Sequence, residues 1–163
     1  ANSMLPSTPE DVLVVGCGTS ELPSRLAATS PKGKGGKVVA VDLSETAVKW
    51  MRRRHTKVSW QVADACTMCP SWDGRFGLLV DKGLLGFAST EDTYGTGALN
   101  LAGERRDRLL AEYRRVLRGG AWAVIVVPES TPWPHGMIGA RGGSSAAAQW
   151  SELRQGKVPD GCV

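Results

Sequence analysis

The stretch D-V-L-V-V-G-C-G-T-S-E-L, residues 11–22, decides the fold of this chain. Val12–Val15 is a short apolar run, typical of a buried strand. It leads directly into Gly16-Cys17-Gly18, and a helix is predicted to begin at Ser20 or just after it. Because glycine has no Cβ, this turn can be tight and can lie close to a ligand. A strand, a glycine-rich turn and a helix with unpaired N–H groups together are typical of a nucleotide-binding corner.

The composition is that of an ordinary globular domain. The 163 residues are 42% hydrophobic and 22% charged, which favours one folded core over disorder. The net charge of +4 is mildly basic and does not require a nucleic-acid partner. We expect no membrane association, because no apolar run is long enough for a span and no signal-peptide pattern opens the chain. The four cysteines are too few and too unevenly spaced for a disulfide scaffold, which favours a reducing, cytoplasmic location.

Downstream of the glycine turn, strands alternate with helices. This pattern predicts an α/β fold with ligands at the carboxyl ends of the strands. Further strands are predicted at 38–41, 58–63, 76–80 and 121–127. Helices are predicted after Ser44 and over 101–117, the second stopped by Gly119-Gly120, with a short turn at 66–71 and a loop at 88–100. The predicted organisation is a lead-in at 1–10, a core at 11–127 and an irregular segment at 128–163.

Three predicted strands end in an aspartate, namely Asp42, Asp64 and Asp81. In a doubly wound sheet Asp42 would lie beside the glycine turn and could accept both hydroxyls of a ribose. A dinucleotide fingerprint would need a third glycine at position 21, where the chain has Glu21, and a pyrophosphate beside this acid would be repelled. A cofactor without phosphate, carrying ribose, adenine and a positive sulfonium, tolerates Glu21. The residues therefore favour S-adenosylmethionine over NAD.

Two other patterns have simpler interpretations. The single Cys66-x-x-Cys69 pair lacks a second pair or nearby histidines, so we interpret these as loop cysteines and expect no metal site. Lys49 and Arg52–Arg54 gather on one side of a predicted helix, which is typical of a solvated basic face. Nucleic-acid binding is weakly supported, because no exposed aromatic residues are interleaved with these charges.

Taken together, several motifs resemble those of class I methyltransferases. They are V-L-V-V-G-C-G-T-S-E-L (12–22), V-V-A-V-D-L-S (38–44), A-D-A (63–65), L-L-V-D-K-G-L-L (78–85) and R-V-L-R-G-G (115–120). The combination is similar to the methyltransferase-like 13 group, which includes lysine and N-terminal methyltransferases of translation elongation factor 1-alpha. The resemblance implies a Rossmann-like, mostly parallel sheet with helices on both faces.

The resemblance also implies residue roles. Gly16, Cys17 and Gly18 would face the methionine part and ribose of the cofactor, and Asp42 would bind the ribose hydroxyls. Leu43 would lie against the adenine, Asp64 would accept from the adenine amino group, and Ala65 would offer a backbone contact. Asp81 and Lys82 would lie at the mouth of the site, beside the methyl group. Simpler roles stay open: a turn or cap acid for Asp42 and Asp64, a small turn residue for Cys17, and a strand-end cap or ion pair for Asp81 and Lys82. The sequence identifies no catalytic base.

The chain departs from the group in two respects. The group commonly reads D-K-G-T-x-D, but the last position here is Gly86, so a carboxylate is missing. Few residues precede the first strand and no convincing strand pair follows the fifth, so we allow for a sheet truncated at both ends, as in a fragment or a shortened member. The expected function is methylation of a protein amine, on a lysine or an N-terminus, with a translation factor as a candidate partner. The alternatives are an inactive scaffold and a small-molecule methyltransferase.

Overall fold

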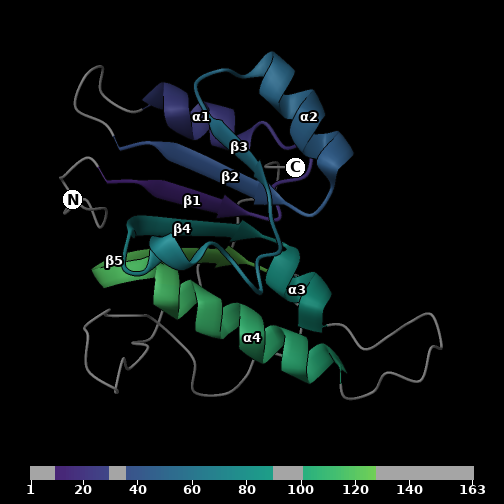
Figure 1. Ribbon diagram of the computed structural model, residues 1–163, viewed down its shortest axis with the longest axis vertical. Coiled ribbons are helices and arrows are strands. Elements are labelled where there is room, and N and C mark those ends of the chain that lie inside the picture. Colours follow the sequence, from purple (N-terminus) through teal and green to yellow (C-terminus); the bar gives the residue numbers. More distant parts are fainter. Residues whose placement is uncertain (1–9, 30–35, 90–100, 128–163) are drawn as a thin grey trace, which may run out of the picture.

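Five parallel strands form one sheet in the part of the chain that the computed structural model describes, residues 10–29, 36–89 and 101–127 (Figure 1). The strands are β1 (Val12–Val15), β2 (Val38–Asp42), β3 (Ser59–Val62), β4 (Phe76–Lys82) and β5 (Leu117–Val126). Their order is β3-β2-β1-β4-β5, and every neighbouring pair is parallel. The chain winds outward from β1 to β3 and then crosses to β4, so the winding reverses between β1 and β4, where ligands bind in such sheets.

Helices cover both faces of the sheet, as the resemblance implied. The helices α1 (Leu22–Thr29) and α2 (Glu45–Arg54) lie on one side, and α3 (Leu84–Ser89) and α4 (Leu101–Val116) on the other (Figure 1). A short 3-10 helix, η1 (Pro70–Trp72), occupies the turn predicted between β3 and β4. The predicted cap of α2 is confirmed, because the Ser44 hydroxyl accepts a 3.2 Å hydrogen bond from the backbone N–H of Ala47.

The sheet is buried on both faces because β1 is apolar at every position and β2 and β4 are apolar over most of their length. In β1, Leu13 and Val15 pack toward α3 and α4, while Val14 packs toward α2, and all three are nearly inaccessible to solvent. Burying a side chain of this size contributes roughly 1.5–3 kcal/mol. The continuous apolar run of 12–15 therefore specifies a central strand rather than an edge strand.

The end of α4 differs from the prediction. The helix ends at Val116, before Gly119-Gly120, and both glycines lie inside β5. Phe76 pairs with Leu117 and Leu78 with Trp122, so residues 118–121 bulge out opposite Gly77. Gly120 has φ +77, a conformation that glycine adopts without strain. The glycine pair thus bulges a strand instead of stopping a helix.

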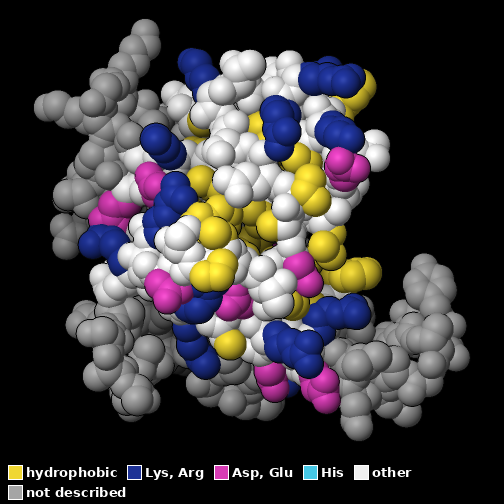
Figure 2. All heavy atoms as spheres, in the orientation of Figure 1, with side chains coloured by type: hydrophobic (Ala, Val, Ile, Leu, Met, Phe, Trp, Pro, Cys, Tyr) yellow, Lys and Arg dark blue, Asp and Glu magenta, His cyan; other side chains and the backbone are white. Residues whose placement is uncertain are grey.

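Ion pairs gather at the amino ends of the strands. Asp11 accepts two hydrogen bonds from the Arg75 guanidinium, at 3.0 and 2.8 Å, and another from the Lys37 backbone N–H at 2.9 Å. Glu10 forms an ion pair with Arg118 at the start of β5. In Figure 2, basic and acidic side chains are interleaved along the left side, where the strands of Figure 1 begin. These pairs join β1, β4 and β5 away from the predicted site.

No helix in the described ranges combines the length and apolar character needed to cross a membrane. Residues 1–9 and 128–163 lie outside the described residues, as does most of the loop predicted at 88–100. The lead-in and the irregular final segment therefore stay predictions.

Candidate functional site

The glycine turn lies at the carboxyl end of β1 and is closed on one side and open on the other. Gly16 and Gly18 have φ +58 and +50, so both positions favour glycine. A Cβ on Gly16 would lie 2.8 Å from the Cβ of Leu84, which closes that side. A Cβ on Gly18 would meet nothing within 4 Å. The open side above Gly18 is a place where a ligand can approach the backbone.

Asp42 joins the turn directly. One oxygen of its carboxylate accepts a 2.8 Å hydrogen bond from the backbone N–H of Gly18, and the other accepts one of 2.8 Å from the backbone N–H of Ser44. The Cys17 N–H also bonds to the Val41 carbonyl oxygen, at 3.2 Å. The sequence analysis predicted that Asp42 lies beside the glycine turn, and this is confirmed. Each carboxylate oxygen has a second lone pair, so Asp42 can still accept hydrogen bonds from a ligand.

Asp64 lies one strand further out, in the segment after β3. The backbone N–H of Ala63 donates to the carbonyl oxygen of Asp42 at 3.1 Å, which fixes the two strand ends together. Asp64 is exposed and accepts a 2.8 Å hydrogen bond from the Cys66 N–H, while Ala65 is buried. Leu43, beside Asp42, is 70% exposed. Leu43 and the carboxylates of Asp42 and Asp64 thus follow two adjacent strands.

Asp81 is placed differently from its predicted position at the mouth. Its side chain is completely buried, and its carboxylate accepts hydrogen bonds from the N–H groups of Leu84 and Leu85 and from the Tyr113 hydroxyl, at 2.7, 2.9 and 2.9 Å. Burial raises the pKa of Asp81, and the three donors oppose that rise. Asp81 therefore begins α3, as the strand-end cap considered above, and only Lys82 of the pair is exposed.

Cys17 lies within the turn as a buried, protonated thiol. Burial and the negative charge of Asp42 together raise the pKa of Cys17 to about 12. The thiol therefore stays neutral at physiological pH and acts as a small packing group on the α2 side of the sheet.

Two residues of the site were missed by sequence reasoning. Tyr113 lies within the helix predicted over 101–117 and was given no role in the site, yet its hydroxyl donates a hydrogen bond to Asp81. Leu84 lies in α3, which the sequence analysis did not predict, and closes one side of the glycine turn. A buried tyrosine needs a polar partner, which was the available signal for Tyr113. Nothing in the local sequence marked Leu84.

The site suits a ligand with hydroxyl and amino groups rather than a phosphate. The acids Asp42 and Asp64 lie on adjacent strand ends, and Glu21 at the start of α1 adds negative charge, where it contacts His55 at 3.1 Å. Within the described ranges, no group of three or more His, Cys, Asp or Glu side chains could hold a metal ion.

A family model described as a methyltransferase domain matches residues 12–120 of this sequence. The chain belongs to this methyltransferase family. S-adenosylmethionine is the cofactor of the domain, and the open glycine turn with its two carboxylates fits the ribose and adenine of that molecule.

Curated methyltransferases are similar to this chain in sequence. The methyltransferase domain is 39% identical over 126 residues to the eEF1A lysine and N-terminal methyltransferase of Danio rerio, and 32% identical over 126 residues to that of Homo sapiens. Both alignments cover 74% of this chain but 16% of the relative. The domain thus spans a small part of the length of these relatives.

A solved structure agrees on the fold. The TehB-like SAM-dependent methyltransferase of Corynebacterium glutamicum matches with a TM-score of 0.59 and 21% identity, over 80% of this chain and 61% of that chain. The Rossmann-like fold expected from the sequence is therefore confirmed for this methyltransferase domain.

Proposed function

We propose that this domain methylates a protein amine, on a lysine side chain or an N-terminus. The single structural observation that carries the methyl-donor part of the proposal is the 2.8 Å hydrogen bond between the Asp42 carboxylate and the Gly18 N–H, because it places a carboxylate that could accept from a ribose at the open turn. The protein acceptor is supported by the names of the curated relatives, which are lysine and N-terminal methyltransferases of a translation factor. We also propose a cytoplasmic location and a translation factor as the partner.

The donor half of the site would be formed by β1, β2 and β3. Gly16, Cys17 and Gly18 would face the methionine part and the ribose, and Asp42 would accept from the ribose hydroxyls. Leu43, exposed next to Asp42, would cover the adenine. Asp64 would accept from the adenine amino group, with a backbone contact from Ala65.

The acceptor half would be formed by the end of β4 and by α3. When bound, the cofactor supplies a methyl group on a positively charged sulfur, and transfer to a neutral amine leaves a thioether and an ammonium that releases its proton to solvent. The exposed Lys82 carries a positive charge beside this place and would disfavour a protonated amine. Asp81 would act through the backbone, by fixing the start of α3. No side chain is assigned as a base, and positioning would supply most of the rate.

The experiment has two stages. Calorimetric titration with S-adenosylhomocysteine measures cofactor-site binding, and incubation with tritium-labelled S-adenosylmethionine, cell extract and purified elongation factor 1-alpha shows which acceptor gains label. Asp42→Asn should weaken binding and reduce labelling together. Asp107→Asn, an exposed acid on α4, is the matched control and should retain both. Label in the small-molecule fraction alone would contradict a protein acceptor and favour the small-molecule alternative.

An inactive scaffold is the second candidate, and Gly86 favours it. This position lacks the carboxylate common in similar sequences, and in α3 it is buried. Binding of S-adenosylhomocysteine without label transfer to any acceptor would support the scaffold. Transfer to a protein band that disappears with Asp42→Asn would contradict it.

A further inference from the structure

The segment between β3 and η1, residues 63–69, carries the proposed adenine contacts yet contains no regular secondary structure. Its first residue is held by the hydrogen bond from Ala63 to Asp42 described above. A local turn follows, in which the Thr67 N–H donates to the carbonyl oxygen of Asp64 at 3.1 Å. These contacts fix the start of the segment, so its position depends on what holds its far end.

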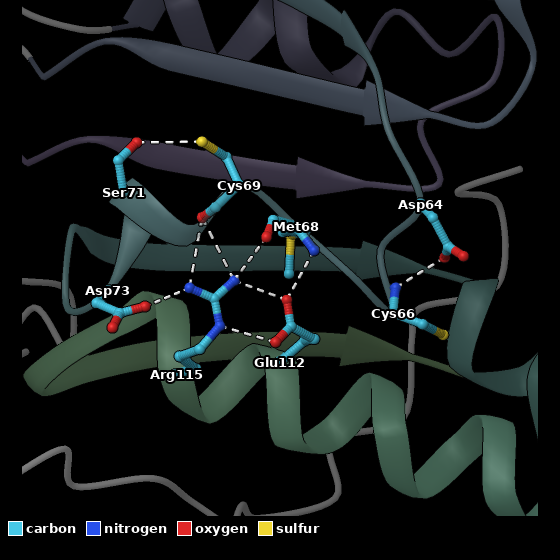
Figure 3. A network of polar contacts seen from close by, with 8 residues as sticks. All are labelled: Asp64, Cys66, Met68, Cys69, Ser71, Asp73, Glu112 and Arg115. Carbon is cyan, nitrogen blue, oxygen red and sulfur yellow. Dashed lines mark hydrogen bonds and ion pairs between the residues drawn. The ribbon is translucent and has the colours of Figure 1, made fainter.

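A pair of charged residues on α4 holds the far end (Figure 3). The Arg115 guanidinium donates to the carbonyl oxygens of Met68 and Cys69, at 3.0 and 3.4 Å. Glu112 accepts from the Met68 N–H at 2.7 Å. Both backbone groups of Met68 are therefore bound by one ion pair, whose members contact each other at 2.7 Å. Arg115 also pairs with Asp73, beyond η1.

The ion pair is well placed to stay formed. The side chains of Arg115 and Glu112 are 27% and 16% exposed, so solvent screens them only in part. The Arg115 hydrogen bonds lower the pKa of Glu112, which keeps the acid charged at neutral pH. The Met68 side chain is buried in the core between the sheet and α4, so its backbone and side chain are held at once.

We propose that Arg115 and Glu112 are positioning residues that set the place of Asp64, and thereby the preference of the site for adenine. This inference rests on the proposed function, in which Asp64 accepts from the adenine amino group. Met68 follows Asp64 by one short turn of chain, and with both ends of the segment held, the carboxylate has little freedom to move. Without the ion pair, the backbone of the far end loses its hydrogen bonds to α4 and is held there chiefly by the buried Met68 side chain.

The test compares two ligands that differ at the group Asp64 would contact. S-adenosylhomocysteine carries the amino group, and S-inosylhomocysteine carries a carbonyl oxygen in its place. The wild-type chain should prefer the first by about tenfold or more, the effect of one hydrogen bond to a charged group. Arg115→Met, which keeps length but removes all donors, should reduce that preference to about twofold or less. Arg115→Lys should restore part of it.

Arg118→Met is the matched control. Arg118 lies a little further along the chain and forms an ion pair with Glu10, but within the described ranges no hydrogen bond or ion pair joins it to residues 63–69. Its variant should keep the ligand preference even where it lowers the unfolding temperature. A purely structural role for Arg115 would weaken both ligands alike and leave their ratio unchanged, so titrations are made well below each variant's unfolding temperature.

The outcomes separate the two proposals. A wild-type chain that binds neither ligand overturns the proposed function, whereas a chain that binds both without preference overturns the role of Asp64 and this inference with it. A wild-type preference that survives in Arg115→Met overturns this inference alone. If Arg115→Met does not fold, Glu112→Gln is measured instead, and an unchanged ratio in that variant overturns the inference in the same way.

Discussion

The two ends of the sheet use acidic residues in opposite ways. At the amino ends, Glu10 and Asp11 are paired with arginine side chains. At the carboxyl ends, Asp42 and Asp64 accept only backbone N–H groups among the contacts described above. An arginine neutralises a carboxylate, whereas a backbone N–H orients it and leaves its charge and a lone pair in place. The acids of the first end therefore hold strands together, whereas those of the second keep acceptor positions that the proposed function assigns to the cofactor.

The largest expected effect is at the closed side of the glycine turn. Gly16→Ala should lower the free energy of unfolding by about 2–4 kcal/mol, since it adds left-handed strain to a clash with Leu84. Gly18→Ala carries only the strain, about 1–2 kcal/mol, because the space beside it is open. Urea unfolding measures both. Equal losses would mean that the Gly16–Leu84 contact is not tight.

Matched substitutions at the two ends of the sheet should have different effects. Asp42→Asn should weaken the binding of S-adenosylhomocysteine by about 10–100-fold, since a charged hydrogen bond to the ligand is lost. Asp11→Asn should leave that affinity unchanged and reduce stability by about 1 kcal/mol, because its partly exposed ion pair with Arg75 is weakened. Calorimetry and chemical unfolding are run on both. An affinity loss in Asp11→Asn comparable to that in Asp42→Asn would end the distinction between the ends.

Tyr113→Phe tests the buried carboxylate of Asp81, near the carboxyl end of β4. Removing the hydroxyl leaves Asp81 with one donor fewer, which should destabilise the chain by about 1–3 kcal/mol. The folded-state pKa of Asp81 is already raised and should rise further in the variant. The folded state then binds the proton more tightly than the unfolded state, so stability is lost as pH rises through the folded pKa. The stability loss caused by the substitution should therefore be smallest below the ordinary pKa of an aspartate and should grow toward neutral pH, as measured by urea unfolding over an acid-to-neutral series. A loss that stays the same over the whole series would show that the hydroxyl does not affect the protonation of Asp81.

The smallest expected effect is a difference in reactivity between two cysteine thiols. Cys69 is exposed and the Ser71 hydroxyl lowers its pKa, whereas Cys17 is buried with a pKa of about 12. Iodoacetamide should therefore alkylate Cys69 much faster than Cys17, as measured peptide by peptide in mass spectrometry, without unfolding the chain. Rapid alkylation of Cys17 in the folded chain would mean that the glycine turn opens readily.

The sequence allowed the central part of the fold to be predicted, because its signals are local. The apolar run at 12–15 and the strand ending at Asp42 need no distant partner, and the position of Asp42 follows from topology alone. The glycine pair 119–120 was misinterpreted because a glycine pair suits both a helix end and a strand bulge, and pairing with β4 decides between them. Asp81 and Arg115 depend on contacts with Tyr113 and Met68, which are distant along the chain and which no local pattern reveals.

The contact between Gly16 and Leu84 has one further consequence. The Cβ of Leu84 occupies the space that any side chain at position 16 would need, so the first turn of α3 packs directly against the glycine turn. A tilt of α3 must therefore press on the backbone at Gly16 or withdraw from it. Substitutions in α3 are therefore constrained at Leu84, because its side chain must fit against the glycine turn.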